Sequence, residues 1–213
     1  MKTLYLKTIS AFVLLTLFTL FQGAYNGLAA NEDGGKIYYT LLKGTINRQL
    51  ADDFEGVLKE AEKVNAKVLI LEIDTFGGRL DAAMRIKDLL VDTKINTIAF
   101  VNKKAISAGA LISLATRHIV MAPGSTIGAA TPVRLTHWEE KPASEKVISY
   151  FRTEMKSTAE AGNHPGEIAA AMVDPDLQIA GVVEKGKLLT LTTKEAIRLK
   201  VAEYEVNDLG ELY

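Results

Sequence analysis

The sequence predicts an α/β fold with a mainly parallel sheet. Two apolar runs, residues 68–73 and 97–101, have the nearly continuous hydrophobicity of strands that are covered on both faces. Each run ends in a break that contains small residues, and a stretch with helical spacing of apolar residues follows it. Because strands that alternate with helices are joined by right-handed crossovers, we expect these strands to lie parallel in one sheet.

The N-terminal half of the chain repeats this strand–helix unit. A strand over residues 36–43 precedes an amphipathic helix. The apolar face of that helix is formed by Leu50, Phe54, Val57, Leu58, Ala61 and Val64. The apolar face of the helix after the strand at 68–73 is formed by Ala83, Ile86 and Leu90. A third helix over residues 107–116 leads into a short strand at 118–122.

The C-terminal half has a less regular pattern. Residues 125–142 are expected to be irregular, either a functional loop or a solvated excursion. Ser144 is expected to cap a helix. The apolar face of that helix is formed by Val147, Phe151, Met155 and Thr158. The later predicted elements are a helix over 165–172, a strand over 187–191, a Thr-capped helix over 193–199 and a tail over 201–206.

Composition limits the chemistry that is available. The 213 residues suit one domain of ordinary size, with 48% hydrophobic and 24% charged residues and a net charge of −1. No basic stripe is present, so nucleic acid is not an expected partner. The absence of cysteine excludes disulfides, thiolate metal sites and a thiol nucleophile. The three histidines have no metal-ligand spacing, and we expect neither a metal nor another cofactor.

The N-terminal segment has the pattern of an export signal. Lys2 and Lys7 precede an apolar run over residues 9–21, and small residues allow cleavage after Ala29 or Ala30. The apolar run is shorter than the roughly 20 residues that a spanning helix usually needs, which favours cleavage over a retained anchor. In either case the rest of the chain is exported. The expected organisation is a signal peptide or anchor at residues 1–30 and a folded domain at residues 31–213.

Two breaks between strand and helix carry residues that suit acyl transfer. Gly77 and Gly78 follow one central strand, and Ser107 follows the next. Open α/β sheets bind ligands at such breaks. A glycine pair can turn backbone N–H groups toward an oxyanion, and a serine at a helix start is accessible as a nucleophile. The pattern therefore indicates a nucleophile facing an oxyanion hole, although two ordinary β–α turns would contain the same residue types.

A serine nucleophile needs a general base, and histidine is the usual one. His118 follows the Ser107 helix and is expected to begin a strand on its far side. His137 falls in the predicted loop and His164 in a turn between helices. We expect all three histidines to be surface residues rather than the base.

A lysine with a neutral amine can replace histidine as the base. Lys146 is the candidate, because it lies in the first turn of the helix after Ser144, where the helix dipole disfavours a cation. The alternative is an ordinary solvated lysine. Lys156 is expected to be solvated in the middle of the same helix, and Lys103 and Lys104 are interpreted as charges at the rim of the site.

Three separated motifs resemble a known family. They are IDTFGGRLDAA, AISAGALISLA and IVMAPGSTIGAATPV, in this order. The sequence resembles the N-terminal protease domain of the NfeD-type membrane-bound serine proteases over residues 36–206. It is more distantly similar to signal peptide peptidase A and the Clp protease subunit. The resemblance implies a ClpP/crotonase-like spiral of ββα units and a Ser–Lys dyad.

The resemblance also implies roles for individual residues. Ser107 matches the nucleophile, and Lys146 matches the lysine that opens the helix after the variable loop. Gly78 and Ala108 match the two backbone donors of the oxyanion hole. The Clp branch has a histidine where this chain has Ala130, so a Clp-type triad is not expected.

Two departures from the family pattern bear on substrate and membrane attachment. Phe76 stands where the family usually has proline, and with Gly77 it is expected to contact substrate. Longer members continue into transmembrane helices and a small β-barrel domain, whereas this sequence stops at Tyr213. We therefore expect either a piece of a longer protein or a short paralogue.

The resulting expectation is an exported serine endopeptidase, on the extracytoplasmic face of the membrane or secreted. It would cleave apolar segments of membrane-associated proteins, including a stomatin-like partner, and act as a homodimer or larger assembly. The alternative is a non-catalytic scaffold domain that keeps the fold and binds the tails of membrane proteins.

Overall fold

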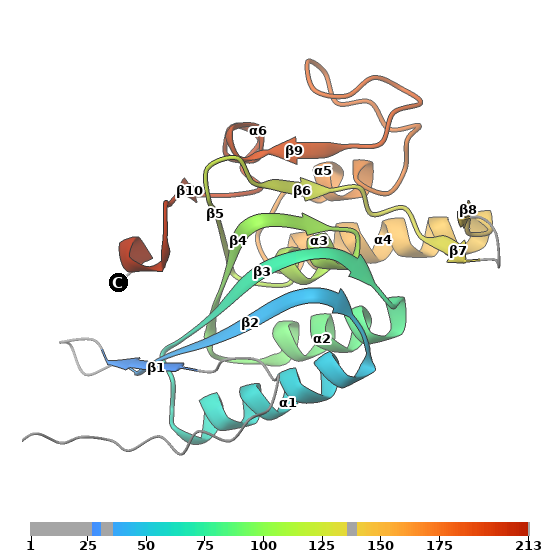
Figure 1. Ribbon diagram of the computed structural model, residues 1–213. Coiled ribbons are helices and arrows are strands. Elements are labelled where there is room, and N and C mark those ends of the chain that lie inside the picture. The colour runs from blue at the N-terminus through green and yellow to red at the C-terminus, as the bar shows by residue number, and fades with distance from the viewer. Residues whose placement is uncertain (1–26, 31–35, 136–139, 213) are drawn as a thin grey trace, which may run out of the picture.

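The computed structural model of the chain describes residues 27–30, 36–135 and 140–212. Figure 1 shows a twisted sheet with helices packed behind it. The strands are β1 (Gly27–Ala30), β2 (Lys36–Ile46), β3 (Val68–Gly78), β4 (Asn96–Ile106), β5 (His118–Met121), β6 (Thr126–Gly128), β7 (Val133–Leu135), β8 (Glu140–Pro142), β9 (Thr190–Thr192) and β10 (Tyr204–Glu205). The helices are α1 (Arg48–Lys63), α2 (Leu80–Asp92), α3 (Ala108–Leu114), α4 (Glu145–Ala161), α5 (Gly166–Ala171), α6 (Thr193–Arg198) and the 3₁₀ helix η1 (Leu209–Leu212).

The main sheet has the order β1-β2-β3-β4-β5-β10, and β6 and β9 extend it from β4. The central strands β2, β3, β4 and β5 pair in parallel, as predicted. Only β1 and β9 pair antiparallel with their neighbours in this sheet, among the described strands. Strands β7 and β8 form a separate hairpin beside α4 (Figure 1).

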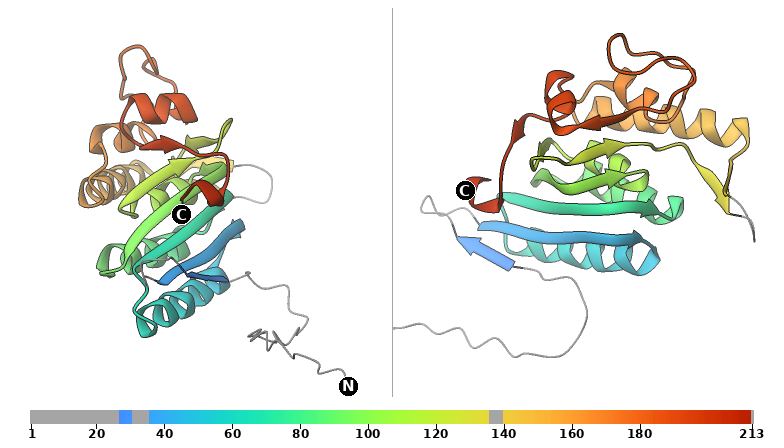
Figure 2. Two further views of the ribbon diagram at one scale, coloured as in Figure 1. Left: turned by 90° about the vertical axis from the view of Figure 1, so that its left-hand side faces the viewer. Right: turned by 45° about the horizontal axis from the view of Figure 1, so that its top comes forward.

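The two faces of the sheet are covered differently. The helices bury the large apolar cluster on one face, which includes the predicted inward side chains of α1 and α2. A smaller cluster around Ile70, Phe100 and Val120 lies on the other face, where Val206 and Leu209 of the C-terminal tail cover it. Figure 2 shows the tail and the helices on opposite sides of the sheet. The helices therefore build the core, while the described residues leave part of the second face uncovered.

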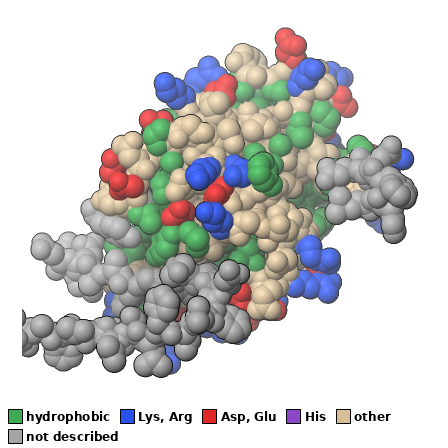
Figure 3. All heavy atoms as spheres, viewed as in Figure 1, with side chains coloured by type: hydrophobic (Ala, Val, Ile, Leu, Met, Phe, Trp, Pro, Cys, Tyr) green, Lys and Arg blue, Asp and Glu red, His purple; other side chains and the backbone are tan. Residues whose placement is uncertain are grey.

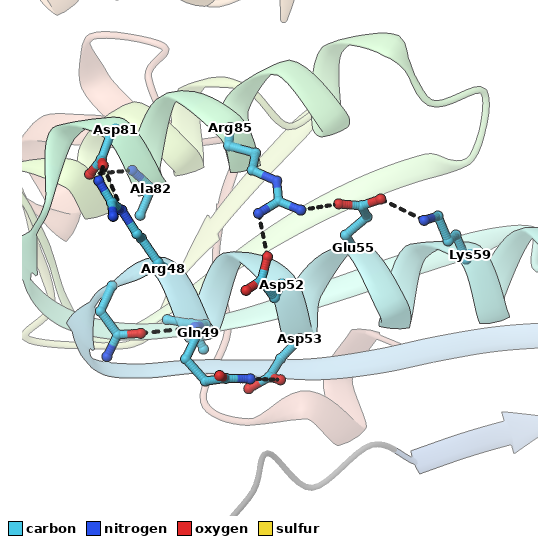
Figure 4. A network of polar contacts seen from close by, with 11 residues as sticks. Arg48, Gln49, Asp52, Asp53, Glu55, Lys59, Asp81, Ala82 and Arg85 are labelled. Carbon is cyan, nitrogen blue, oxygen red and sulfur yellow. Dashed lines mark hydrogen bonds and ion pairs between the residues drawn. The ribbon is translucent and has the colours of Figure 1, made fainter.

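Ion pairs on the outer surface join α1 to α2 (Figure 4). Arg85 of α2 reaches Asp52 and Glu55 of α1, and Arg48 of α1 reaches Asp81 of α2. Hydrogen bonds from the nearby Arg79 and from Arg48 hold the pKa of the Asp81 carboxyl well below its usual range. Because these groups are largely solvated, we interpret the network as a modest stabiliser of helix packing.

The central strands continue beyond the ends that the apolar runs predict. β3 extends to Gly78 and β4 to Ile106, so the expected breaks belong to the strands. The pairing shifts register at these points, between Ile73 and Thr75 in β3 for example. β4 also changes partner, from β5 at Ile98–Val101 to β6 at Lys104–Ile106. The second half of each strand therefore bends into a new sheet direction, which gives the spiral of ββα units.

Other expectations need correction. The segment predicted to be irregular, residues 125–142, contains β6, β7 and β8. Val147 was expected on the buried face of α4 but is exposed, because the first turn of α4 extends past the core. The cap of α6 is Thr192, whose hydroxyl accepts a hydrogen bond from the Glu195 N–H in a capping box.

The predicted leader lies largely outside the described residues. Its last residues form β1, which pairs with β2, so the predicted cleavage after Ala29 or Ala30 would fall at the end of that strand. Within the described part of the chain, no helix has the length and hydrophobicity to cross a membrane.

Candidate active site

Ser107 occupies a strained position between β4 and α3. Its backbone angles are φ 56° and ψ −117°, a conformation that is unfavourable for a residue with a side chain. Such a residue typically costs about 1–3 kcal/mol and persists only where its surroundings enforce it. Its N–H donates to the Gly128 carbonyl at 2.9 Å, and its carbonyl accepts from the Ala110 N–H at 2.9 Å. Its hydroxyl makes no cap hydrogen bond to α3, which leaves the oxygen available for chemistry.

Gly77 lies directly against Ser107, so the structure brings the two predicted motifs together. A Cβ added to Gly77 would lie 2.7 Å from the Ser107 Cβ and 3.1 Å from its Oγ. Gly77 also has φ +106°, where a side chain would be strained. The glycine is therefore required both by its conformation and by the approach of the serine.

The end of β3 meets the start of α3 at a corner formed by Gly77 and Ser107. Thr75 fixes this corner and was not singled out in the sequence. Its hydroxyl donates to the Gly44 carbonyl and accepts a hydrogen bond from the Gly77 N–H at 2.9 Å. Its methyl group would lie 2.6 Å from a Cβ on Gly109, so α3 can begin here only with glycine at that position. The threonine before Phe76 and the glycine two residues after Ser107 are the sequence signals that could have identified this contact.

The two predicted oxyanion donors lie on either side of this corner. The Gly77 N–H is occupied by Thr75, so it is not free to bind an oxyanion. Gly78 is the next residue, and β2 packs so closely against it that an added Cβ would lie 2.1 Å from the Ile46 carbonyl oxygen. The Ala108 N–H lies in the first turn of α3, where backbone N–H groups have no acceptor within the helix.

No hydrogen bond joins Lys146 to Ser107 among the described residues. Lys146 lies in the exposed first turn of α4, and the Ser144 side chain makes no cap hydrogen bond there. Among the described residues, the Lys146 amine has no hydrogen-bond partner, and the Ser107 hydroxyl has none either. The Ser107–Lys146 dyad therefore stays a prediction.

The opposite end of α4 is firmly attached to the core. Gly162, just past the helix, packs against the end of α3, because an added Cβ would lie 2.6 Å from the Leu114 carbonyl oxygen. Nearby, His164 donates from Nε2 to the Thr116 carbonyl at 2.8 Å. Arg152 in the middle of the helix pairs with the Asp174 carboxylate after α5. Helix α4 is therefore held along its second half, while its first turn is exposed.

Comparison with known proteins now identifies the family. A family model described as the NfeD1b N-terminal domain matches residues 36–213. The chain belongs to this family. It is 34% identical to the membrane protein NfeD1b of Bacillus subtilis, over 87% of this chain and 42% of that protein. It is 33% identical to the membrane-bound protease PH1510 of Pyrococcus horikoshii, over 94% of this chain and 43% of that protein. The chain therefore spans less than half the length of either curated relative.

Solved structures agree with this assignment. The 1510-N protease specific for a stomatin homologue from Pyrococcus horikoshii has a TM-score of 0.65 at 32% identity, covering 83% of this chain and 76% of that chain. A lysine-to-alanine variant of 1510-N in complex with a substrate peptide has a TM-score of 0.73 at 32% identity, covering 83% of this chain and 77% of that chain. ClpP1 of Listeria monocytogenes, at 20% identity and a TM-score of 0.63, covers 82% and 94% and shows the fold alone. The predicted ClpP/crotonase-like α/β fold is confirmed.

Within this NfeD1b-type domain, neither described histidine is near Ser107. His118 begins β5 as predicted, and its Nδ1 lies 2.8 Å from a Glu203 carboxylate oxygen. His118 pairs with Ile98 near the start of β4, whereas Ser107 directly follows Ile106 at the end of that strand. The eight residues from Ile98 to Ile106 correspond to about 26 Å of strand at roughly 3.3 Å per residue. His164 was expected on the surface but is buried, which lowers its pKa. His137 lies outside the described residues.

Ala130 is the residue that the sequence resemblance aligns with the histidine of the Clp branch. It is buried, and its N–H donates to the Met172 carbonyl at 2.7 Å. The next residue, Thr131, donates from its hydroxyl to the Val173 carbonyl at 2.6 Å. These bonds attach the strand after β6 to the segment after α5, so this position serves packing in the NfeD1b-type domain.

Phe76 projects from the same corner into solvent. It is 77% exposed, the largest exposure among the large hydrophobic side chains of the described residues. Because it precedes Gly77, which touches Ser107, it lies at the edge of the candidate site. Of the predicted rim lysines, Lys104 lies beside it, with Nζ 4.6 Å from the ring centroid.

Proposed function

We propose that this domain is a serine endopeptidase with Ser107 as its nucleophile. The observation that carries the proposal is the strained backbone of Ser107, enforced between the Gly128 carbonyl and the close approach of Gly77. Strain of this kind gathers at active sites, because the surrounding structure must hold a reactive group in one position. Two ordinary β–α turns would not require a serine in this conformation.

In the proposed mechanism, the Ser107 hydroxyl attacks a peptide carbonyl while the neutral amine of Lys146 takes its proton. The N–H groups of Gly78 and Ala108 stabilise the oxyanion that forms on the carbonyl oxygen. Lys146 then gives the proton to the leaving amine, and water hydrolyses the acyl-enzyme. No metal or cofactor takes part in these steps.

The proposal requires Lys146 to approach Ser107. Because the first turn of α4 is exposed and its Ser144 cap makes no side-chain hydrogen bond, this end of the helix has few contacts to break. We infer that substrate binding, or assembly with another copy, brings the amine within hydrogen-bond reach. The lysine-to-alanine variant of 1510-N that binds a substrate peptide supports a role for a lysine in this family.

The proposed substrate is an apolar segment of a membrane-associated protein, bound across Gly77 and Phe76. The support is the exposed ring of Phe76 and the relative's specificity for a stomatin homologue. A homodimer or larger assembly on the extracytoplasmic face of the membrane is part of the same proposal. The N-terminal export pattern and the membrane proteins among the relatives support this location.

The test compares Ser107→Ala and Lys146→Ala with the wild-type domain, using a library of apolar peptides and mass spectrometry. Each variant should lower the cleavage rate by about 10³-fold or more, as loss of a nucleophile or its base does in other enzymes. Lys156→Ala is the matched control, because Lys156 lies on the same helix and pairs with Glu167. It should retain full activity, and thermal melting should show that all three variants fold.

Retained cleavage in Lys146→Ala would exclude the dyad, and retained cleavage in Ser107→Ala would exclude the nucleophile. The position of Lys146, exposed and not bonded to Ser107, favours one alternative, a non-catalytic domain that binds membrane-protein tails. A serine-reactive fluorophosphonate separates the two functions. A protease is labelled at Ser107, and labelling is lost in Ser107→Ala; a scaffold binds apolar peptides without being labelled.

A further inference from the structure

A group of charged side chains lies beside Phe76, and its Lys104 contacts the Phe76 ring. Lys43 of β2, Asp74 of β3 and Lys104 of β4 lie side by side across three neighbouring strands. Figure 3 shows basic side chains gathered around acidic and apolar ones near the middle of the face in view. The group therefore borders the corner at which Gly77 meets Ser107.

Asp74 holds this group together. One of its carboxylate oxygens lies 2.6 Å from the Lys104 amine and the other 4.0 Å from the Lys43 amine. The Asp74 side chain is only 13% exposed, whereas that of Lys43 is 63% exposed. The ion pair fixes Lys104 against the ring of Phe76, where a cation is attracted to the aromatic face.

Two ammonium groups share one carboxylate in this group, because Asp74 lies between Lys43 and Lys104. The neighbouring carboxylate of β3, Glu72, instead accepts hydrogen bonds from Tyr39 and Asn102. A lysine amine has three donors, and the hydrogen bond to Asp74 uses one of those on Lys104. Donors therefore remain for a second carboxylate.

The spacing relates this charge to the nucleophile. Lys104 precedes Ser107 by three residues on β4, which corresponds to about 10 Å of extended chain. A peptide bound in an extended form advances by about the same 3.3 Å per residue. A substrate side chain within about three residues of the scissile bond can therefore reach the Lys104 amine.

We propose that Phe76 and Lys104, with Lys43, form a subsite that selects an apolar segment carrying a carboxylate within about three residues of the scissile bond. Phe76 contacts the apolar side chain, and the lysines attract the carboxylate. Asp74 is a positioning residue that keeps Lys104 over the ring. The inference rests on the proposed function, because it takes Ser107 to mark the scissile bond.

The experiment measures peptide binding by the Ser107→Ala protein, so it does not depend on turnover. The probes are fluorescent apolar peptides with glutamate or glutamine at each of the three positions on either side of the centre. At low salt, the best glutamate peptide should bind about three- to fivefold more tightly than its glutamine partner, as expected for a largely exposed ion pair. The preference should disappear near about 1 M salt, where the screening length is about 3 Å.

Lys104→Met should remove the preference in the same background. Lys94→Met is the matched control, because Lys94 is exposed and precedes the opposite end of β4. It removes the same charge and should leave the preference intact. Equal binding of all glutamate and glutamine pairs by the Ser107→Ala protein would overturn the inference.

Asp74→Asn tests the charge argument in the opposite direction. Asparagine keeps an oxygen that can accept from the Lys104 amine, so Lys104 stays in place while the competing charge is removed. The preference for the glutamate peptides should therefore increase, whereas a purely structural role would weaken binding of both peptides equally. Phe76→Ala should weaken binding of both peptides. Cleavage by the wild-type protein is measured separately. A glutamate preference in binding without cleavage would reject the protease function but keep the subsite. Cleavage without a glutamate preference would keep the protease function but reject the subsite.

Discussion

The two halves of the proposed dyad lie in very different surroundings. Ser107 is held by hydrogen bonds to both of its backbone groups and by contact with Gly77. Lys146 lies in an exposed first helical turn without a described side-chain partner. The proposed nucleophile therefore has a fixed backbone position, while the proposed base lies on a helical turn that makes few contacts. Activity that depends on the first turn of α4 is then open to control by substrate or by assembly.

The largest expected effect tests the close packing around Ser107. Gly78→Ala would place a Cβ 2.1 Å from the backbone carbonyl of Ile46, and a backbone atom cannot rotate away. We expect a loss of about 3 kcal/mol or more in the free energy of unfolding, together with loss of fluorophosphonate labelling. Urea denaturation measures the first and gel fluorescence the second.

Gly56→Ala is the matched control for this change. Gly56 lies in the middle of α1, and nothing lies within 4 Å of an added Cβ. Alanine should therefore stabilise the domain by about 0.5–1 kcal/mol through its better helix propensity. If Gly78→Ala were as well tolerated as Gly56→Ala, the close packing of β2 on the corner would be wrong.

The second prediction concerns the attached end of α4. Burial lowers the pKa of His164, partly opposed by its hydrogen bond to the Thr116 carbonyl and by the nearby Glu203. The unfolded chain protonates this imidazole near the ordinary value of 6.5. The unfolded state therefore binds the proton first as the pH falls, and the free energy of unfolding should decrease from pH 6.5 downward to the lowered pKa.

His164→Gln should flatten this decrease, because glutamine does not titrate but can still donate to the Thr116 carbonyl. Urea denaturation at a series of pH values measures the slope. His118→Gln is the comparison variant: because His118 helps to lower the pKa of His164, its loss should reduce the decrease without abolishing it. An unchanged slope in His164→Gln would show that this histidine does not carry the acid sensitivity.

Part of the candidate site could be predicted from the sequence, and part could not. The Gly77–Ser107 contact was predictable, because both motifs follow neighbouring parallel strands whose carboxyl ends must meet at one edge. The role of Thr75 was not, because it depends on the Gly44 carbonyl and on the approach of Gly109 from other elements. The extent of β3 and β4 was also missed, since their bent ends lack the apolar run that marks a central strand.

The first turn of α4 shows the other limit of prediction. Helical periodicity placed Phe151, Met155 and Thr158 correctly in the core, and it placed Val147 there as well. Periodicity shows which face of a helix is apolar but not where the core beneath it ends. The position of Lys146 relative to Ser107 depends on that boundary, so the local sequence could not determine it.

A third prediction separates strain from chemistry at Ser107. Ser107→Gly should raise the free energy of unfolding by about 1 kcal/mol, because glycine adopts this backbone conformation without the penalty of a Cβ. Ser107→Ala keeps the Cβ and should not be stabilised. Both variants should lose labelling and cleavage, so a stability gain confined to glycine would assign the strain to the backbone. Equal stability of the two variants would show that the corner is not strained.

The smallest expected effect lies at the bend in β4. Lys103 has φ 93°, and its N–H donates to the hydroxyl of buried Ser125, which in turn donates to the Val101 carbonyl. This Ser125 bridge enforces the bend at which β4 changes partner from β5 to β6.

Lys103→Gly should therefore stabilise the domain by up to about 1 kcal/mol, since glycine relieves the strain but adds freedom to the unfolded chain. Lys103→Ala removes the same charge without relieving the strain, so its melting temperature should be lower than that of the glycine variant. Equal melting temperatures of the two variants would show that Lys103 is not strained. The backbone strain in this part of the sheet would then lie at Ser107.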